Sequence, residues 1–209
     1  ILFLDEFPEF SRAALETLRQ PLEEREVTVS RVEASVTYPA NFQLVAAMNP
    51  CPCGHFPDRS SCRCTDGQIT RYLQKVSGPM LDRIDICVEA SPITYGDIRS
   101  SGNNESSREI RARVEQARKI QGERFAGENI RCNGEMSGRH IRKFCWLGRE
   151  EEKFMEEIFK KLALSARMHD RILKVARTTA DLAEEKKIRL ADLCEAVSYV
   201  KSRDKFWGN

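Results

Sequence analysis

The sequence predicts an α/β domain followed by an all-α domain. Continuous apolar runs at 1–4 and 42–48 are typical of buried strands in a parallel sheet. From residue 105 onward apolar residues instead recur at helical spacing, and a linker rich in Gly, Ser and Asn lies between the two patterns, around 100–107. We therefore expect an α/β part at 1–100 and a helical domain at 108–209.

The α/β part begins with a strand at 1–4 that ends in two carboxylates. Apolar residues spaced as one helical face then predict a helix at 11–22. Residues 26–30 alternate with a period of two, and the alternation resumes at 34–38, as it does in a β-hairpin.

The second apolar run, 42–48, predicts a central parallel strand that is covered on both faces. A cysteine-rich loop at 51–64 follows it, and then a helix at 68–76. A Gly-Pro pair at 78–79 breaks the chain before a third strand, which we expect at 81–90.

Apolar stripes at helical spacing run through the second part and predict an all-α domain. The stripes consist of Ile110, Val114, Ala117 and Ile120, of Phe154, Ile158 and Leu162, and of Leu173, Ala176 and Ala180. A last helix is predicted at 190–200.

The composition gives no sign of a membrane segment or of a bulk polyanion-binding surface. No run approaches the ~20 apolar residues of a membrane helix, and Asp5 and Glu6 end the first apolar run too early for a signal peptide. The 34 basic and 32 acidic residues leave a net charge of +2, so any nucleic-acid surface has to come from local clustering. We expect a cytoplasmic protein with no membrane partner. Because the chain starts inside an apolar strand without an initiator Met, we also expect a fragment of a longer protein.

Four apolar residues followed by Asp5 and Glu6 match the Walker B pattern. A buried strand would present Asp5 rigidly to the Mg²⁺ of Mg-ATP, and Glu6 would orient and deprotonate the attacking water. The alternative is a core strand that simply ends in a polar turn.

Two further polar residues follow in the order that a nucleotide site requires. Asn49 ends the second buried strand, where a sensor-1 residue hydrogen-bonds the attacking water or the γ-phosphate. An Asn-Pro turn is the alternative. Arg83 stands where an arginine finger projects into the nucleotide site of a neighbouring subunit, and a surface ion pair with Asp82 or Asp85 is the alternative.

Four of the eight cysteines form a C-x-C-x8-C-x-C cluster, whereas the others stand singly in apolar surroundings. Two close pairs of thiols joined by a loop can supply the tetrahedral set of thiolates that Zn²⁺ prefers. We therefore predict a structural zinc site at Cys51, Cys53, Cys62 and Cys64. Disulfides or free thiols are the alternatives, and His55 can replace one cysteine as a ligand.

Motifs along nearly the whole chain resemble those of the magnesium-chelatase-like AAA+ ATPases of the ComM or YifB group. The matching residues are Leu4-Asp5-Glu6-Phe7 with Leu18-Arg19-Gln20-Pro21-Leu22-Glu23, then Met48-Asn49-Pro50-Cys51-Pro52-Cys53-Gly54, then Gly78 through Asp85, and Leu164-Ser165-Ala166-Arg167 with Val175-Ala176-Arg177-Thr178. The resemblance implies an incomplete AAA+ parallel-sheet core, with the Walker B and sensor-1 strands, the hairpin and the cysteine-rich loop, and then a helical lid domain.

The resemblance also implies roles for the hairpin and the lid. The hairpin at 27–38 would precede sensor 1 and point into a central pore, and Arg167 would be the sensor-2 arginine. A helix-start arginine on a solvated face is the alternative for Arg167, and Arg171 and Arg177 compete with it. The phosphate loop of the family, G-x-x-x-x-G-K-[ST], does not occur in the sequence, so we expect the fragment alone to be inactive.

For the full-length protein, the resemblance implies an ATP- and Mg²⁺-dependent helicase that forms a hexameric ring and promotes branch migration of DNA. Arg59, Arg63 and Arg71 around the cysteine loop, and Arg31 near the hairpin tip, are candidate phosphate contacts, with a solvated basic surface as the alternative. A chelatase-type subunit that remodels a partner protein for metal insertion, and never touches DNA, is the second hypothesis. A metal-binding interaction module with a Walker-B-like strand is the third.

Overall fold

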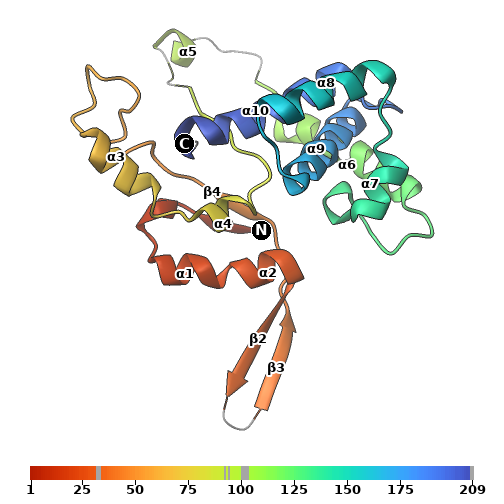
Figure 1. Cartoon of the computed structure of the whole chain (residues 1–209), viewed down its shortest axis with the longest axis horizontal. Helices are drawn as coiled ribbons and strands as arrows, with labels where there is room; N and C mark the ends of the chain where they lie inside the picture. Colours follow the sequence, from red (N-terminus) through yellow and green to blue (C-terminus); the bar gives the residue numbers. More distant parts are fainter. Residues whose placement is uncertain (32–33, 92, 94, 100–103, 208–209) are drawn as a thin grey trace. The chain divides into compact units, whose positions relative to one another are not determined.

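The computed structural model describes residues 1–31, 34–91, 93, 95–99 and 104–207 (Figure 1). The chain falls into two compact units. Unit 1 consists of Ile1–Cys87 together with Arg203–Asn209, and unit 2 consists of Val88–Ser202. Residues 100–103 of the expected linker lie outside the described residues.

Unit 1 contains a two-stranded parallel sheet. β1 (Leu2–Leu4) pairs with β4 (Leu44–Ala46), so that Leu2 lies opposite Leu44. Both apolar runs therefore form the predicted strands. Because the strands are parallel, their carboxyl ends meet at the same edge of the sheet.

The sheet has one packed face and one open face. Leu4 and Leu44 pack in a core with Phe7, whereas Phe3 and its partner Val45 are 59% and 39% exposed. The prediction of a strand covered on both faces is therefore wrong for the described part of unit 1, where the Phe3 face is left open.

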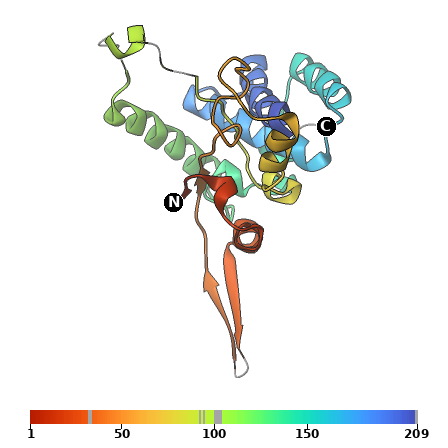
Figure 2. The ribbon, with the colours of Figure 1, turned by 90° about the vertical axis from the view of Figure 1, so that its left-hand side faces the viewer.

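An antiparallel hairpin leads from the helices back to the second strand. β2 (Glu26–Arg31) pairs with β3 (Ala34–Pro39), and Figure 2 shows the hairpin extending away from α1. Thr28 and Thr37 lie opposite each other, and their hydroxyl groups share a hydrogen bond of 3.0 Å. The predicted hairpin is confirmed, and its turn residues, 32–33, lie outside the described residues.

Two short helices, α1 (Arg12–Thr17) and α2 (Arg19–Glu24), replace the single helix that the apolar spacing predicted. Ser11 caps α1, because its hydroxyl accepts a hydrogen bond of 3.2 Å from a backbone N–H of the first turn. Pro21 has no N–H to donate to the carbonyl of Thr17, so the helix is interrupted between the two.

α3 (Asp66–Leu73) and α4 (Gly78–Leu81) follow the cysteine-rich loop. α3 confirms the helix expected in this region. It begins earlier than predicted because Thr65 and Gln68 form a capping box, in which each side chain bonds the backbone N–H of the other residue.

The third strand, predicted at 81–90, is wrong. Leu81 ends α4, and the described residues from 84 to 91 take part in no sheet. Ile86 and Val88 are exposed. A strand needs a hydrogen-bonded neighbour, and the described strands pair only as β1 with β4 and β2 with β3, so an apolar sequence alone does not make one here.

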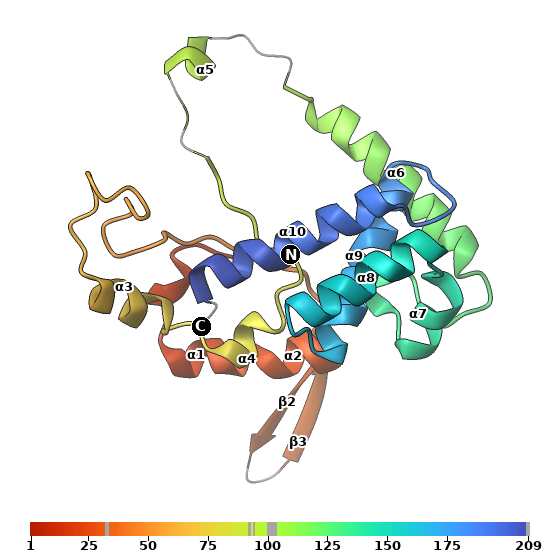
Figure 3. The ribbon, with the colours of Figure 1, turned by 45° about the horizontal axis from the view of Figure 1, so that its top comes forward.

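Unit 2 is helical, as predicted, and Figure 3 shows its helices α6 to α9 and the first part of α10. Its elements are α5 (Tyr95–Arg99), α6 (Ser107–Arg124), the 3₁₀ turn η2 (Asn133–Glu135), α7 (Gly138–Phe144), α8 (Arg149–Lys161), α9 (Ala166–Leu182) and α10 (Leu190–Trp207), whose last residues belong to unit 1. α9 contacts α6, α7 and η2. None of the helices in the described part of the chain combines the length and the hydropathy that a membrane-spanning segment requires.

The core of unit 2 follows the predicted stripes in α8 and α9 but only partly in α6. Leu173 and Ala176 are buried as expected. On α6, Ala117 is buried, whereas Ile110 and Val114 are exposed. The first half of the α6 stripe is therefore not part of the core of unit 2.

Candidate functional site

The two carboxylates after β1 stand exposed at the carboxyl edge of the sheet. Glu6 adopts the left-handed conformation (φ 50°, ψ 43°), which is uncommon for a residue other than glycine and costs of order 1 kcal/mol or more. Its N–H donates to Oδ1 of Asp5 (2.8 Å), and the next N–H, of Phe7, donates to the carbonyl of Ala47 (3.0 Å). These bonds hold the turn at which both carboxylates leave the strand.

Asn49 lies at the same edge of the sheet. The N–H of Ala47 donates to the carbonyl of Leu4 (2.9 Å), which keeps the end of β4 beside the end of β1. Asn49 follows two residues later and is exposed. The structure thus brings Asp5, Glu6 and Asn49 to one edge, and their roles in nucleotide chemistry remain predictions.

Tyr72, on α3, is a residue at this edge that the sequence did not single out. Its side chain is 7% exposed, and Met48, the residue before Asn49, packs against the buried cluster that contains it. Burial and then the charge of Glu9 raise the pKa of Tyr72, and the N–H of Asn49 acts in the opposite direction. Lys75 lies over the Tyr72 ring (5.5 Å) and pairs with Glu9 (3.0 Å). In the sequence, Tyr72 is simply one apolar position of a helix.

The four clustered cysteines meet in space. Their sulfur atoms all lie within 4.8 Å of one another, and Sγ of Cys51 is 3.4 Å from that of Cys53 and 3.8 Å from that of Cys62. A tetrahedral Zn²⁺ with Zn–S bonds of about 2.3 Å separates its sulfur ligands by roughly 3.8 Å. The donor set therefore fits zinc, and the separations are much longer than the ~2 Å of a disulfide. His55 is not part of the cluster in the described residues.

Backbone N–H groups point at the sulfur atoms, as they do around thiolates. The N–H of Phe56 donates to Sγ of Cys51 (3.4 Å), and those of His55 and Arg63 lower the pKa of Cys53 to about 6. Desolvation instead raises the pKa of Cys64 to about 12. The thiols thus differ in how readily they ionise, and only a bound cation would favour four thiolates together.

Arg83 is not a solvated surface arginine. Its side chain is 9% exposed and pairs with Glu23 on α2 at 2.5 Å, and it also donates to the carbonyl of Pro79. Its Nε atom is buried and has no hydrogen-bond partner in the described structure. Glu23 was not among the partners predicted for Arg83, which were the nucleotide of a neighbouring subunit or, as the alternative, Asp82 or Asp85.

The three lid arginines differ in burial. Arg167 is exposed in the first turn of α9, whereas Arg171 and Arg177 are buried. Arg177 is 2% exposed and donates from Nε to Asp181 (3.1 Å) and from its other nitrogens to the carbonyls of Glu185 (2.5 Å) and Lys186 (3.1 Å). These bonds give Arg177 a structural role inside unit 2, which leaves Arg167 as the exposed candidate.

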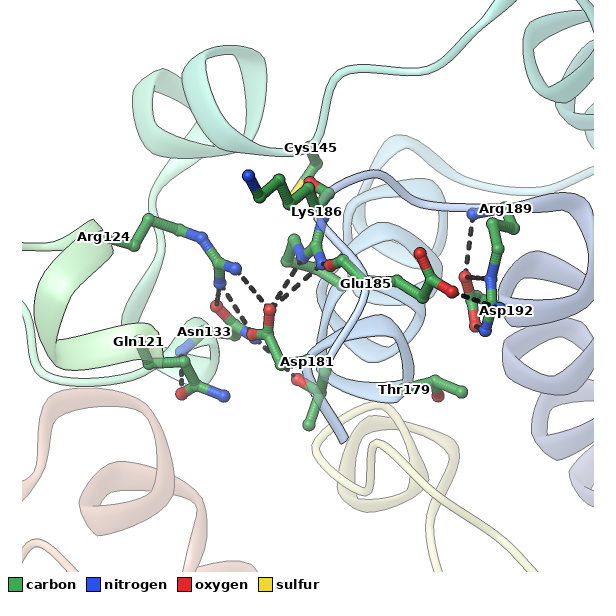
Figure 4. A network of polar contacts seen from close by, with 12 residues as sticks. Gln121, Arg124, Asn133, Cys145, Thr179, Asp181, Glu185, Lys186, Arg189 and Asp192 are labelled. Atoms are coloured by element: carbon green, nitrogen blue, oxygen red, sulfur yellow. Dashed lines mark hydrogen bonds and ion pairs between the residues drawn. The ribbon is translucent and has the colours of Figure 1, made fainter. Parts of the chain in front are cut away.

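Asp181 is the centre of this buried network (Figure 4). Its carboxylate is completely buried and also accepts bonds from Arg124 (2.7 Å) and from the Asn133 amide (2.8 Å). One buried carboxylate therefore faces two guanidinium groups, with an amide completing its hydrogen bonds.

The basic residues around the cysteine loop are exposed, but one of them is engaged. Arg59 forms an ion pair with Asp66 and lies over the Phe56 ring (5.1 Å). Arg63 and Arg71 are exposed, as is Arg31 at the end of β2. No described contact in this region shows how a nucleic acid would bind, so nucleic-acid contact stays a prediction.

Comparison with known proteins gives matches along nearly the whole chain. Residues 1–98 match the family model described as magnesium chelatase, subunit ChlI, and residues 104–200 match that of the ChlI C-terminal region. Competence protein ComM of Haemophilus influenzae is 44% identical over 200 residues, which are 95% of this chain and 38% of that protein. The uncharacterized YifB proteins of Escherichia coli and Salmonella typhimurium are 44% and 43% identical over 201 residues, again 95% of this chain and 38% of their own length. The chain thus spans well under half the length of these relatives.

Proposed function

The chain belongs to the magnesium-chelatase-like family, and from that membership we propose that it is part of an ATP-hydrolysing AAA+ motor. The observation that carries the proposal is the meeting of Asp5, Glu6 and Asn49 at the carboxyl edge of the β1–β4 sheet. Ligands of α/β proteins bind at this edge, outside the carboxyl ends of the strands. The cytoplasm is the expected location.

Each of these side chains has a distinct task in the proposed reaction. Mg²⁺, when bound with ATP, neutralises phosphate charge as the γ-phosphoryl group is transferred. Asp5 would hold that ion with an anionic oxygen. Glu6, which is exposed at the end of the strand, would accept a proton from the attacking water, and the Asn49 amide would hydrogen-bond the water or the γ-phosphate.

The arginines complete the proposed site from other parts of the assembly. Arg83 would contact the γ-phosphate bound by a neighbouring subunit of a homo-oligomeric ring, a hexamer in our proposal. Arg167 would contact the nucleotide from the lid. A triphosphate competes with Glu23 for Arg83, and its larger negative charge favours the exchange.

Glu6→Gln in the full-length protein tests the assignment, because glutamine keeps the shape of the side chain but cannot accept the proton. We expect ATP hydrolysis to be abolished and ATP binding to be preserved. Glu9→Gln is the matched control: Glu9 is an exposed carboxylate of the same turn and pairs with Lys75 at 3.0 Å. Normal hydrolysis by Glu6→Gln would overturn the proposal.

We further propose that the motor acts on DNA, as a helicase that promotes branch migration. The support is the similarity to a relative named as a competence protein. Branched DNA should bind the full-length hexamer and stimulate its ATPase activity, and the absence of both effects would overturn this substrate.

A second candidate is a chelatase-type subunit that remodels a protein partner during metal insertion. The observation in its favour is that both family models carry the name of magnesium chelatase. It predicts ATPase activity that responds to a protein partner and not to DNA.

We propose a structural Zn²⁺ at Cys51, Cys53, Cys62 and Cys64, because the sulfur separations match a tetrahedral site. Four protein ligands leave no open position for a substrate. Metal analysis of the chain purified under reducing conditions should find about one Zn²⁺ per molecule. Cys53→Ser should lower this content and Cys194→Ser, at an exposed cysteine outside the cluster, should not. Metal-free protein would refute the site.

A further inference from the structure

We infer that the metal-bound cysteine loop holds the catalytic amide in place, and that Tyr72 and Gly54 are positioning residues for Asn49. The inference rests on the proposed function of Asn49 and on the proposed zinc site. It gives the metal a role in positioning Asn49, in addition to its role in folding the loop.

The first link is along the chain. Only Pro50 separates Asn49 from Cys51, and its ring fixes its own φ angle near −65°. Cys51 is fully buried, and its carbonyl accepts a hydrogen bond from the N–H of Gly54 (3.0 Å). A ligand fixed by the metal therefore restrains a backbone that reaches Asn49 within two peptide units.

The second link is to the side chain of Asn49. Gly54, in the turn between the two cysteine pairs, has a φ of +82°, which favours glycine. A Cβ atom built on Gly54 would lie 3.8 Å from both Cγ and Oδ1 of Asn49, which is ordinary van der Waals contact. The backbone of the loop thus lies directly beside the amide group.

The third link is to the backbone of Asn49. The Tyr72 ring packs with Cys51, Ile69 and Leu73 in one buried cluster, and Met48, which directly precedes Asn49, packs against that cluster. The N–H of Asn49 lowers the pKa of the Tyr72 hydroxyl, so the two groups lie close together. α3, which carries Tyr72, begins at the Thr65 cap, directly after Cys64.

The metal would join these links. Cys51 precedes the loop next to Asn49, and Cys64 ends the loop next to α3, so a shared ion cross-links the two segments that touch Asn49. Without that cross-link, the loop from 51 to 64 has to be closed by weaker contacts at a cost in conformational entropy. The amide then loses a fixed position at the edge of the sheet.

Amide hydrogen exchange of the whole chain, followed by NMR, tests the inference without any ATPase measurement. Tyr72→Phe removes the hydroxyl that lies near the Asn49 N–H but keeps the ring, so exchange at Asn49 should accelerate by on the order of fivefold while the zinc content stays at that of the wild type. Removing the metal with a chelator should accelerate it further. Tyr199→Phe, which removes a hydroxyl bonded to Glu195 in unit 2, is the matched control and should leave Asn49 unchanged.

In the full-length protein, Tyr72→Phe should lower kcat for ATP hydrolysis and leave the Kd for ATP unchanged, because a displaced Asn49 affects the attacking water more than ground-state binding. The possible results distinguish the metal site, the positioning of Asn49 and the proposed motor from one another. Wild-type chain without zinc overturns the metal site and this inference together. Zinc-bound protein in which neither Tyr72→Phe nor chelation changes exchange at Asn49 overturns the inference and leaves the metal site and the motor intact.

Discussion

Asp181→Asn should destabilise unit 2 more than any exchange of a surface acid. The carboxylate is completely buried and compensates Arg124 and Arg177, and Arg177 itself is 2% exposed. Burial already lowers the pKa of Arg177, and the charge of Asp181 opposes this effect. Removing one partner of a buried ion pair leaves an uncompensated charge, which costs about 3–5 kcal/mol. With an m-value of about 1–3 kcal/mol/M in urea, the unfolding midpoint should fall by at least roughly 1 M.

Urea unfolding of the whole chain measures this loss. Trp207 belongs to unit 1, so a Trp207→Phe background leaves Trp146 as a fluorescence probe of unit 2, with far-UV circular dichroism as a second probe. Glu156→Gln is the matched control, because Glu156 and Lys160 form an exposed pair at 2.6 Å one helical turn apart. Such pairs contribute about 0.3–0.5 kcal/mol.

A loss below about 1 kcal/mol for Asp181→Asn would refute the reasoning, since it would mean that the guanidinium groups are not held by this carboxylate. It would also have a functional consequence. Arg177 was set aside as a sensor-2 candidate because its hydrogen bonds are used inside unit 2. If the network is weak, Arg177 is again a candidate for the sensor-2 arginine, together with Arg167.

Three further predictions concern Arg83 in unit 1, the cysteine-rich loop at 51–64 and the stability of the protein in acid. Mixing Arg83→Ala subunits with Glu6→Gln subunits of the full-length protein should partly restore ATP hydrolysis if the arginine acts across an interface, and no rescue at any ratio would argue against action in trans. Thr65→Ala removes the capping box of α3 and should cost about 1 kcal/mol, seen as faster loss of zinc to a chelator, whereas an unchanged rate would show that the cap does not support the loop. The Lys143 hydrogen bond lowers the pKa of Glu128 below its ordinary 4.5, so the stability that it contributes is present above that value and is lost as the pH falls through the lower folded-state pKa. The difference in Tm between wild type and Glu128→Gln should shrink on acidification, and a pH-independent difference would contradict the assignment.

Periodicity and spacing predicted the parts of the fold that depend on local pattern. The hairpin at Glu26–Pro39 follows from alternation, and its register puts like with like, such as Thr28 opposite Thr37. The clustering of Cys51 with Cys64 follows from two close pairs joined by a loop. In each case the residues that interact are close in sequence, so the pattern contains nearly all the information needed.

The sequence predictions that failed concern segments whose structure depends on a neighbouring strand or helix. A local sequence pattern does not identify that neighbour. An apolar segment such as 81–90 becomes a strand only beside another strand, and an apolar stripe such as Ile110 with Val114 is buried only where another element covers it. Pro21 is a different case: its missing N–H was visible in the sequence, and it explains why one predicted helix is two.

The functional roles could not be assigned from residue type and order alone. The burial and the contacts of each side chain reduce the number of roles that it can have. Arg83 looked like either a finger or a surface ion pair, yet its side chain is nearly buried beside Glu23. A guanidinium held in this way is pre-oriented, and it can reach a phosphate only by exchanging one anionic partner for another. Tyr72 shows the converse, because a residue that looks like core in the sequence packs in a cluster with Met48, directly beside Asn49. A search for site residues in this family should therefore include the buried side chains that support the motif residues, since a misplacement of about 1 Å can slow a reaction by roughly a hundredfold.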